Sequence, residues 1–157
     1  MVTKAACGLK NSPTNLTGTQ ENVEYYIHTN KLDYNSGETV QILYRVTNRS
    51  NKPVDLGYSV LGLFSCRFDI TDDEGKRVWK WPWVTPLGPS RHFRLGPYES
   101  KEFELNWDMI NDNGTLRTDD DFAAGPGIYN IAGELNIEPE EDRVPVSVSV
   151  TIEGSGG

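Results

Sequence analysis

The stretch from Val40 to Thr47 reads VQILYRVT, and apolar side chains recur at its alternate positions. Successive residues of a β-strand point to opposite faces of a sheet, so this alternation predicts a strand with one buried face. The same period of two recurs from Val144 to Ile152, where four valines and an isoleucine alternate with proline, serine and threonine. Both stretches therefore predict strands of a half-buried sheet.

Further alternating runs lie before and between these two, and turn residues separate them. The runs begin near Val23, Val54, Cys66, Arg77, Phe103 and Tyr129, and the turns include Asn35 to Gly37, Asn48 to Pro53, Asp72 to Gly75 and Gly125 to Gly127. No window spaces apolar residues three and four apart for more than one helical turn. We therefore predict an all-β fold, an immunoglobulin-like antiparallel β-sandwich of seven to nine strands, in preference to a barrel.

The chain divides into three parts by composition. Residues 1–21 are polar and without periodicity, which predicts a flexible lead-in that lacks the apolar core of a signal peptide. Residues 22–153 form the predicted sandwich. Residues 154–157, Gly-Ser-Gly-Gly, have the composition of a flexible linker and are predicted to form a flexible tail. The 157 residues are 36% hydrophobic, which is enough apolar surface for one core.

The net charge of −8 sets limits on the partners of the chain. Nucleic acids and anionic membrane surfaces are bound by clustered lysine and arginine, so neither is predicted as a partner. No apolar run approaches the length of about 20 residues that spans a bilayer. Cys7 and Cys66 match no metal-ligand spacing. The sequence allows either a disulfide between them or two unpaired thiols.

Several short motifs follow one another in an order that resembles a known family. They are Ser36-Gly37-Glu38, Val46-Thr47-Asn48, Asn51-Lys52-Pro53, Phe68-Asp69-Ile70, Asp73-Glu74-Gly75, Val78-Trp79-Lys80-Trp81, Leu95 to Lys101, Trp107-Asp108 and Gly125 to Tyr129. In that order, over roughly residues 24 to 137, the chain resembles the intracellular proteinase inhibitor (BsuPI) family. The resemblance implies a stoichiometric inhibitor of subtilisin-type serine proteases, located in the cytoplasm.

A proline- and tryptophan-rich segment is the candidate inhibitory loop. It comprises Trp81, Pro82, Trp83, Val84, Thr85, Pro86 and Leu87. Prolines restrict the backbone and lower the entropy lost on binding, and the apolar side chains suit the subsites of a protease. We expect the scissile region between Val84 and Leu87, flanked by Trp81 and Trp83, while Trp79 lies in the core.

Three alternatives to this inhibitory loop stay open. Tryptophans at alternate positions are more often core residues than binding anchors, and prolines are common in connections. Inhibition could equally reside in the turn from Asp72 to Gly75 or in the segment from Arg91 to Arg94. The long lead-in and the valine-rich last strand suggest an alternative, a non-inhibitory immunoglobulin-like binding or structural module of a secreted or surface-attached protein.

Catalytic and metal-binding motifs are not recognisable in the sequence. Neither His28 nor His92 belongs to a triad pattern, so we predict no enzyme and no cofactor. A calcium site built from Asp112, Asp119 and Asp121 is conceivable, but a solvated acidic loop is the simpler expectation. We expect a monomer, with Pro145 protecting the last strand against pairing with another copy.

Overall fold

The structure, a computed structural model, describes residues 22–59, 66–82, 91–111, 122–138 and 143–154. No helix occurs within these ranges. The strands are β1 (Val23–Thr29), β2 (Asp33–Asn35), β3 (Val40–Asn48), β4 (Val54–Ser59), β5 (Cys66–Thr71), β6 (Arg77–Trp81), β7 (Arg91–Leu95), β8 (Ser100–Trp107), β9 (Ile110–Asn111), β10 (Phe122–Ala123), β11 (Gly127–Leu135), β12 (Ile137–Glu138) and β13 (Val146–Glu153).

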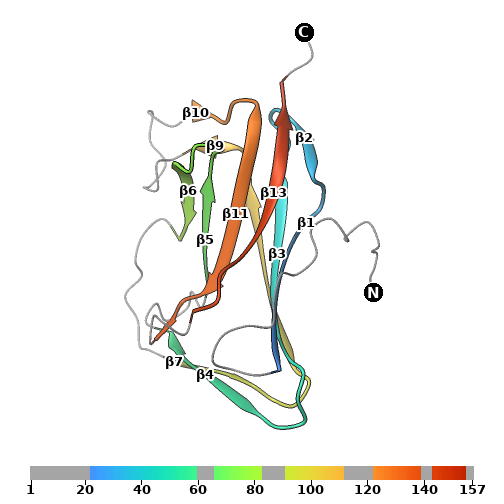
Figure 1. The fold of residues 1–157 in the computed structure, drawn as a ribbon, viewed down its shortest axis with the longest axis vertical. Helices are drawn as coiled ribbons and strands as arrows, with labels where there is room; N and C mark the ends of the chain where they lie inside the picture. Colours follow the sequence, from blue (N-terminus) through green and yellow to red (C-terminus); the bar gives the residue numbers. More distant parts are fainter. Residues whose placement is uncertain (1–21, 60–65, 83–90, 112–121, 139–142, 155–157) are drawn as a thin grey trace.

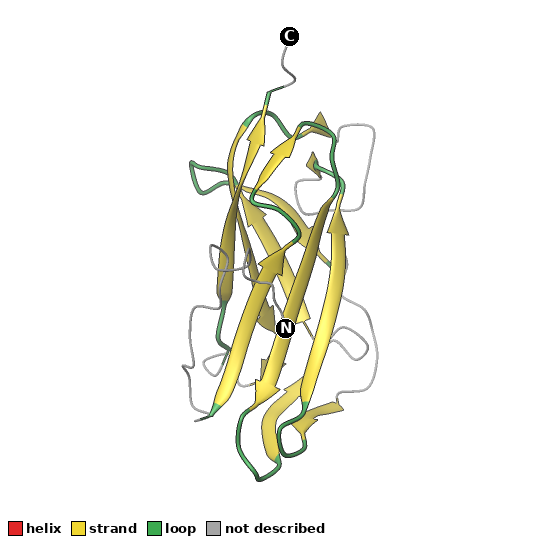
Figure 2. Ribbon diagram, turned by 90° about the vertical axis from the view of Figure 1, so that its right-hand side faces the viewer, coloured by secondary structure: helices red, strands yellow, loops and turns green. Residues whose placement is uncertain are grey.

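Two layers of strands enclose one core. One layer contains the three-stranded sheet β1-β3-β8, and the other contains the five-stranded sheet β2-β13-β11-β5-β6. The smaller sheet β12-β4-β7 lies at the end of the molecule away from the C-terminus, as Figure 1 shows. Most long strands run close to the long axis of the molecule (Figure 2). This arrangement confirms the predicted all-β, immunoglobulin-like sandwich.

The first part of the chain joins both layers. β1 pairs antiparallel with β3, from Val23 opposite Asn48 to Thr29 opposite Ile42. After a short connection, β2 pairs parallel with β13 of the opposite layer, with Tyr34 opposite Ile152. Tyr34 is buried, so this crossing closes one side of the core.

Residues at alternate positions form the core, as the sequence predicts. The four apolar side chains of β3 that face inward are at most 2% exposed, and Trp79 and Trp107 are buried with them. Val144, Val146, Val148, Val150 and Ile152 are all buried as well. Burial of these large side chains drives the closure of the two layers, because each contributes about 1.5–3 kcal/mol or more relative to exposure.

The structure differs from the prediction in three respects. The described residues form nine strands of five or more residues and four shorter ones, and β2 pairs parallel rather than antiparallel. Pro145 precedes β13 instead of lying within it, and β13 is an interior strand between β2 and β11. Among the described residues, β2 pairs only with Thr151 to Glu153 of β13, so the protection of the strand edge by Pro145 stays a prediction. β7 is a strand that periodicity did not identify, because it contains only two inward-facing apolar residues.

Candidate functional site

β6 is the outermost strand of the five-stranded sheet, and a tight hairpin joins it to β5. Within the turn, the backbone N–H of Gly75 donates to the carbonyl of Asp72 at 3.0 Å. The Asp72 carboxylate also accepts hydrogen bonds from the backbone N–H groups of Glu74 and Lys76. Gly75 has a φ of +82°, a conformation that glycine adopts at little cost. The turn therefore fixes the register of β6.

A bulge in β6 determines which of its side chains are buried. Trp79 lies opposite Ile70, but Thr71 lies opposite Arg77, so Val78 is an extra residue in the strand. Val78 and Trp79 are consequently both buried, at 6% and 2% exposure. A bulge of this kind bends the strand and redirects its side chains. The middle of β6 is thereby anchored in the core.

Trp81 occupies a different position from Trp79. It lies opposite Phe68, its ring centroid is 6.3 Å from that of Phe68, and it is only partly buried. Pro82 follows it and is also partly exposed. The expectation that Trp79 lies in the core is confirmed. Of the seven candidate loop residues, the structure places only Trp81 and Pro82, and residues 83–87 lie outside the described residues.

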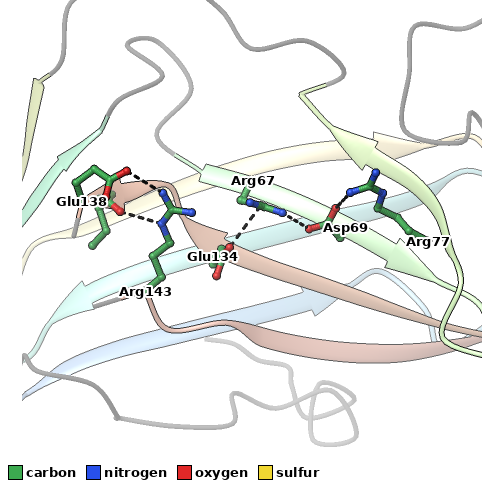
Figure 3. Close-up of polar contacts among 7 residues, drawn as sticks. Arg67, Asp69, Arg77, Glu134, Glu138 and Arg143 are labelled. Atoms are coloured by element: carbon green, nitrogen blue, oxygen red, sulfur yellow. Dashed lines mark hydrogen bonds and ion pairs between the residues drawn. The ribbon is translucent and has the colours of Figure 1, made fainter. Parts of the chain in front are cut away.

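Ion pairs on the sheet connect β6 to β5 and β5 to β11, as Figure 3 shows. The Arg67 guanidinium lies 2.9 Å from the Asp69 carboxylate and 3.4 Å from that of Glu134. Arg77 of β6 lies 3.8 Å from the second Asp69 oxygen. Partly exposed pairs of this kind contribute at most about 1 kcal/mol each. Sequence analysis missed the network, because the register that brings these residues together is not readable from periodicity.

The segment from Arg91 to Arg94 is the alternative inhibitory segment of the sequence analysis. It lies within β7, which pairs antiparallel with β4. Phe93 is buried, and the Asp55 carboxylate of β4 lies 2.8 Å from His92 Nδ1 and accepts a hydrogen bond from Arg94 Nε at 3.0 Å. Partial burial raises the pKa of Asp55, but hydrogen bonds from the Gly57 N–H, Arg94 and His92 outweigh it and lower that pKa overall. These charged groups therefore support strand pairing.

The described part of the chain contains histidine, cysteine and carboxylate side chains of the types that ligate metal ions. Within it, no group of three or more His, Cys, Asp or Glu side chains is arranged to hold a metal ion. Asp112, Asp119 and Asp121, the residues of the conceivable calcium site, lie outside the described residues. Among the described ranges there is also no helix of the length and apolarity that crossing a membrane requires.

Cys66 lies at the start of β5 as a free, buried thiol. Burial disfavours the thiolate and raises the pKa of Cys66 to about 12, from an ordinary value of 9.0. In the unfolded chain the thiol loses its proton first, so unfolding releases protons at alkaline pH. The free energy of unfolding should therefore decrease as the pH rises from about 9 towards 12.

The burial of Cys66 predicts a low thiol reactivity. In a Cys7→Ser variant, which leaves Cys66 as the remaining cysteine, we expect a disulfide reagent to modify the folded protein very slowly at neutral pH. Modification should become complete when denaturant unfolds the chain. The release of the reagent's coloured thiol measures both rates, and rapid modification without denaturant would show that Cys66 is accessible.

Comparisons with known proteins identify no family. No family model matches the chain, and no curated protein matches it. Among solved structures, a β-glucosidase from Listeria innocua in complex with glucose has a TM-score of 0.44 at 15% identity, covering 86% of this chain and 17% of its own. A β-glucosidase from Erythrobacter marinus has a TM-score of 0.46 at 12% identity, covering 83% of this chain and 15% of its own.

A third solved structure is similar over nearly its whole length. The CARDB domain of the PF1109 protein from Pyrococcus furiosus, in complex with di-metal ions, has a TM-score of 0.43 and 16% identity. The match covers 88% of this chain and 94% of that domain. This chain spans less than a fifth of the two β-glucosidases, and all three likenesses are distant. They identify neither a ligand nor a reaction, and the resemblance to the proteinase inhibitor family stays a prediction.

Proposed function

We propose that this chain is a non-catalytic binding module that presents the β6 edge to an extended segment of a partner protein. The observation that supports this most is that β6 ends the five-stranded sheet while its bulge and Trp79 hold it firmly against the core. An edge strand offers unpaired backbone groups, and many recognition domains bind an extended peptide there as an additional strand. A rigid edge binds more tightly because little entropy is lost on binding.

Inhibition of a subtilisin-type serine protease is the particular form that we propose for this recognition. β6 ends at Trp81, and Pro82 leads into the sequence Trp83-Val84-Thr85-Pro86-Leu87. A segment that follows an anchored strand and is rich in proline can enter a protease cleft in an extended form. Trp81 then flanks the contact as a partly exposed aromatic side chain, the kind of residue that often dominates an interface.

The positive charges of β6 favour binding of a different protein over binding of a second copy of this chain. β6 carries Arg77 and Lys80 in a chain whose net charge is −8. Two copies of β6 placed edge to edge would bring these cations close together, and natural proteins use such charges to prevent strand pairing between copies. We therefore propose a monomer that binds its partner in a one-to-one complex.

Titration of a subtilisin-type protease with the chain tests this proposal. We expect activity to fall linearly to near zero at equimolar chain, and the inhibition constant to rise by roughly ten-fold or more in a Val84→Ala or Leu87→Ala variant. Tyr98→Ala is the matched control, because Tyr98 is 67% exposed and lies in the turn before β8. Full protease activity with excess chain, or digestion of the chain, would reject inhibition.

A further inference from the structure

A polar groove lies on the outer face of the β1-β3-β8 sheet, in the layer opposite β6. Its volume is about 540 Å³, within the range of about 300–1,000 Å³ of pockets that hold small-molecule ligands. The side chains that line it on the outer face are those of His28, Asn30, Gln41, Leu43, Glu104 and Asn106. Sequence analysis placed the polar residues of β3 outside the core, but it did not bring them together with β1 and β8.

Strand register arranges these side chains in two neighbouring rows. His28, Leu43 and Glu104 are direct partners across the three strands. Gln41 and Asn106 form the next row, and the backbone N–H of Asn30 donates to the Gln41 carbonyl at 3.1 Å. Adjacent strands are about 4.8 Å apart, so the side chains of each row are regularly spaced across the sheet. The groove is therefore built on rigid paired backbone.

Internal hydrogen bonds orient the carboxamide of Asn30. Its Oδ1 accepts a hydrogen bond from the Tyr34 hydroxyl at 2.6 Å and another from the backbone N–H of Gln41 at 3.0 Å. The carbonyl side of the carboxamide is thus occupied by the protein. Its Nδ2 then serves as the donor available for a ligand in the groove.

The imidazole of His28 is held by an aromatic stack. The rings of His28 and Tyr26 lie 6.1 Å apart between centroids and are inclined by only 16°. The Arg45 guanidinium carbon lies 4.6 Å from the centre of the Tyr26 ring, so Tyr26 is held in turn. Together with Leu43, the imidazole gives the groove an apolar patch beside its carboxamides.

We infer that this groove binds a neutral oligosaccharide. Sugar hydroxyl groups both donate and accept hydrogen bonds, which suits the carboxamides of Asn30, Gln41 and Asn106 and the carboxylate of Glu104. The apolar C–H faces of a sugar ring match Leu43 and the His28 ring. No lysine or arginine lines the groove, and Glu104 repels anions, so a phosphorylated or acidic sugar does not fit.

The position of the groove favours a sugar over a peptide. β3 is paired on both sides, with β1 and with β8, so a ligand on this face meets side chains rather than unpaired strand backbone. An extended peptide gains most of its affinity from backbone pairing at a sheet edge, which this face does not offer. The inference does not depend on the proposed function, because β6 belongs to the opposite sheet.

Nuclear magnetic resonance titration of the full chain tests this inference. The probes are soluble neutral gluco-, xylo- and manno-oligosaccharides in α- and β-linked forms, and the readout is the set of backbone amide shifts. We expect at least one of them to shift the amides of β1, β3 and β8 around Gln41 in a saturable manner. The affinity should fall roughly ten-fold, equivalent to about 1.4 kcal/mol, in Gln41→Ala and in Asn106→Ala.

Two comparisons make the outcome decisive. Gln41 and Asn106 are exposed, so both variants should keep the amide spectrum of the folded parent outside the groove. Ser149→Ala changes an exposed residue of β13 in the opposite sheet and should leave the affinity unchanged. The inference is overturned if no sugar of the panel shifts the groove amides, or if the groove variants bind as well as Ser149→Ala.

Discussion

Replacing Trp79 with alanine is expected to lower the free energy of unfolding by about 3–5 kcal/mol, a large part of the about 5–15 kcal/mol of a typical domain. Trp79 is 2% exposed, lies opposite Ile70 and is among the largest fully buried side chains of the described core. Its removal leaves a cavity. The surrounding side chains fill this cavity only in part, because hydrogen-bonded strands hold them in place. Urea unfolding followed by far-ultraviolet circular dichroism measures the change.

Trp81→Ala and Tyr98→Ala calibrate this result. Trp81 is only partly buried, so its replacement should cost clearly less than that of Trp79. Tyr98 is 67% exposed, and its replacement should change the free energy of unfolding by no more than about 0.5 kcal/mol. If Trp79→Ala were no more destabilising than Trp81→Ala, the placement of Trp79 inside the sandwich would be wrong.

Replacing Gly57 with alanine is expected to be the second strongest perturbation. Gly57 has a φ of +117°, and a Cβ built there would lie 2.5 Å from the backbone carbonyl oxygen of Glu138 in β12. The unfavourable backbone conformation alone costs on the order of 1–3 kcal/mol. The overlap adds to this cost, because a backbone oxygen held in the β4–β12 pairing cannot rotate away as a side chain could.

Gly37→Ala is the matched control for this prediction. Gly37 also has a positive φ, +88°, but no atom lies within 4 Å of a Cβ built there. The difference between the two variants in thermal unfolding therefore isolates the contact between Gly57 and Glu138. Equal destabilisation by both variants would show that β12 does not approach β4 as closely as the structure has it.

Sequence periodicity predicted the parts of the fold in which burial and alternation coincide. β3 and β13 are of this kind, because each buries every second side chain over eight or more residues. β2 and β12 were missed, since strands of two or three residues show no period and form only when a partner from elsewhere in the chain meets them. The parallel pairing of β2 with β13 depends on such a distant partner.

The candidate sites show the same limit. Alternation assigned Trp79 and Trp81 to one face of a strand, which agrees with their partners Ile70 and Phe68. It could not distinguish a buried from a partly exposed indole, because that depends on which side chains the rest of the fold packs over each position. The groove around Gln41 could not be predicted from the sequence either. Its residues come from three strands, and only the strand register brings them together.

The central claim, recognition of an extended partner segment along the β6 edge, is tested most directly by hydrogen exchange. The exchange of amides from Arg77 to Trp81 is measured in the free chain and in a mixture with an excess of a subtilisin-type protease whose catalytic serine has been replaced. We predict slower exchange in β6 in the mixture, with unchanged exchange in β8, an edge strand of the β1-β3-β8 sheet. Unchanged exchange in β6, or slower exchange in β8 alone, would contradict it.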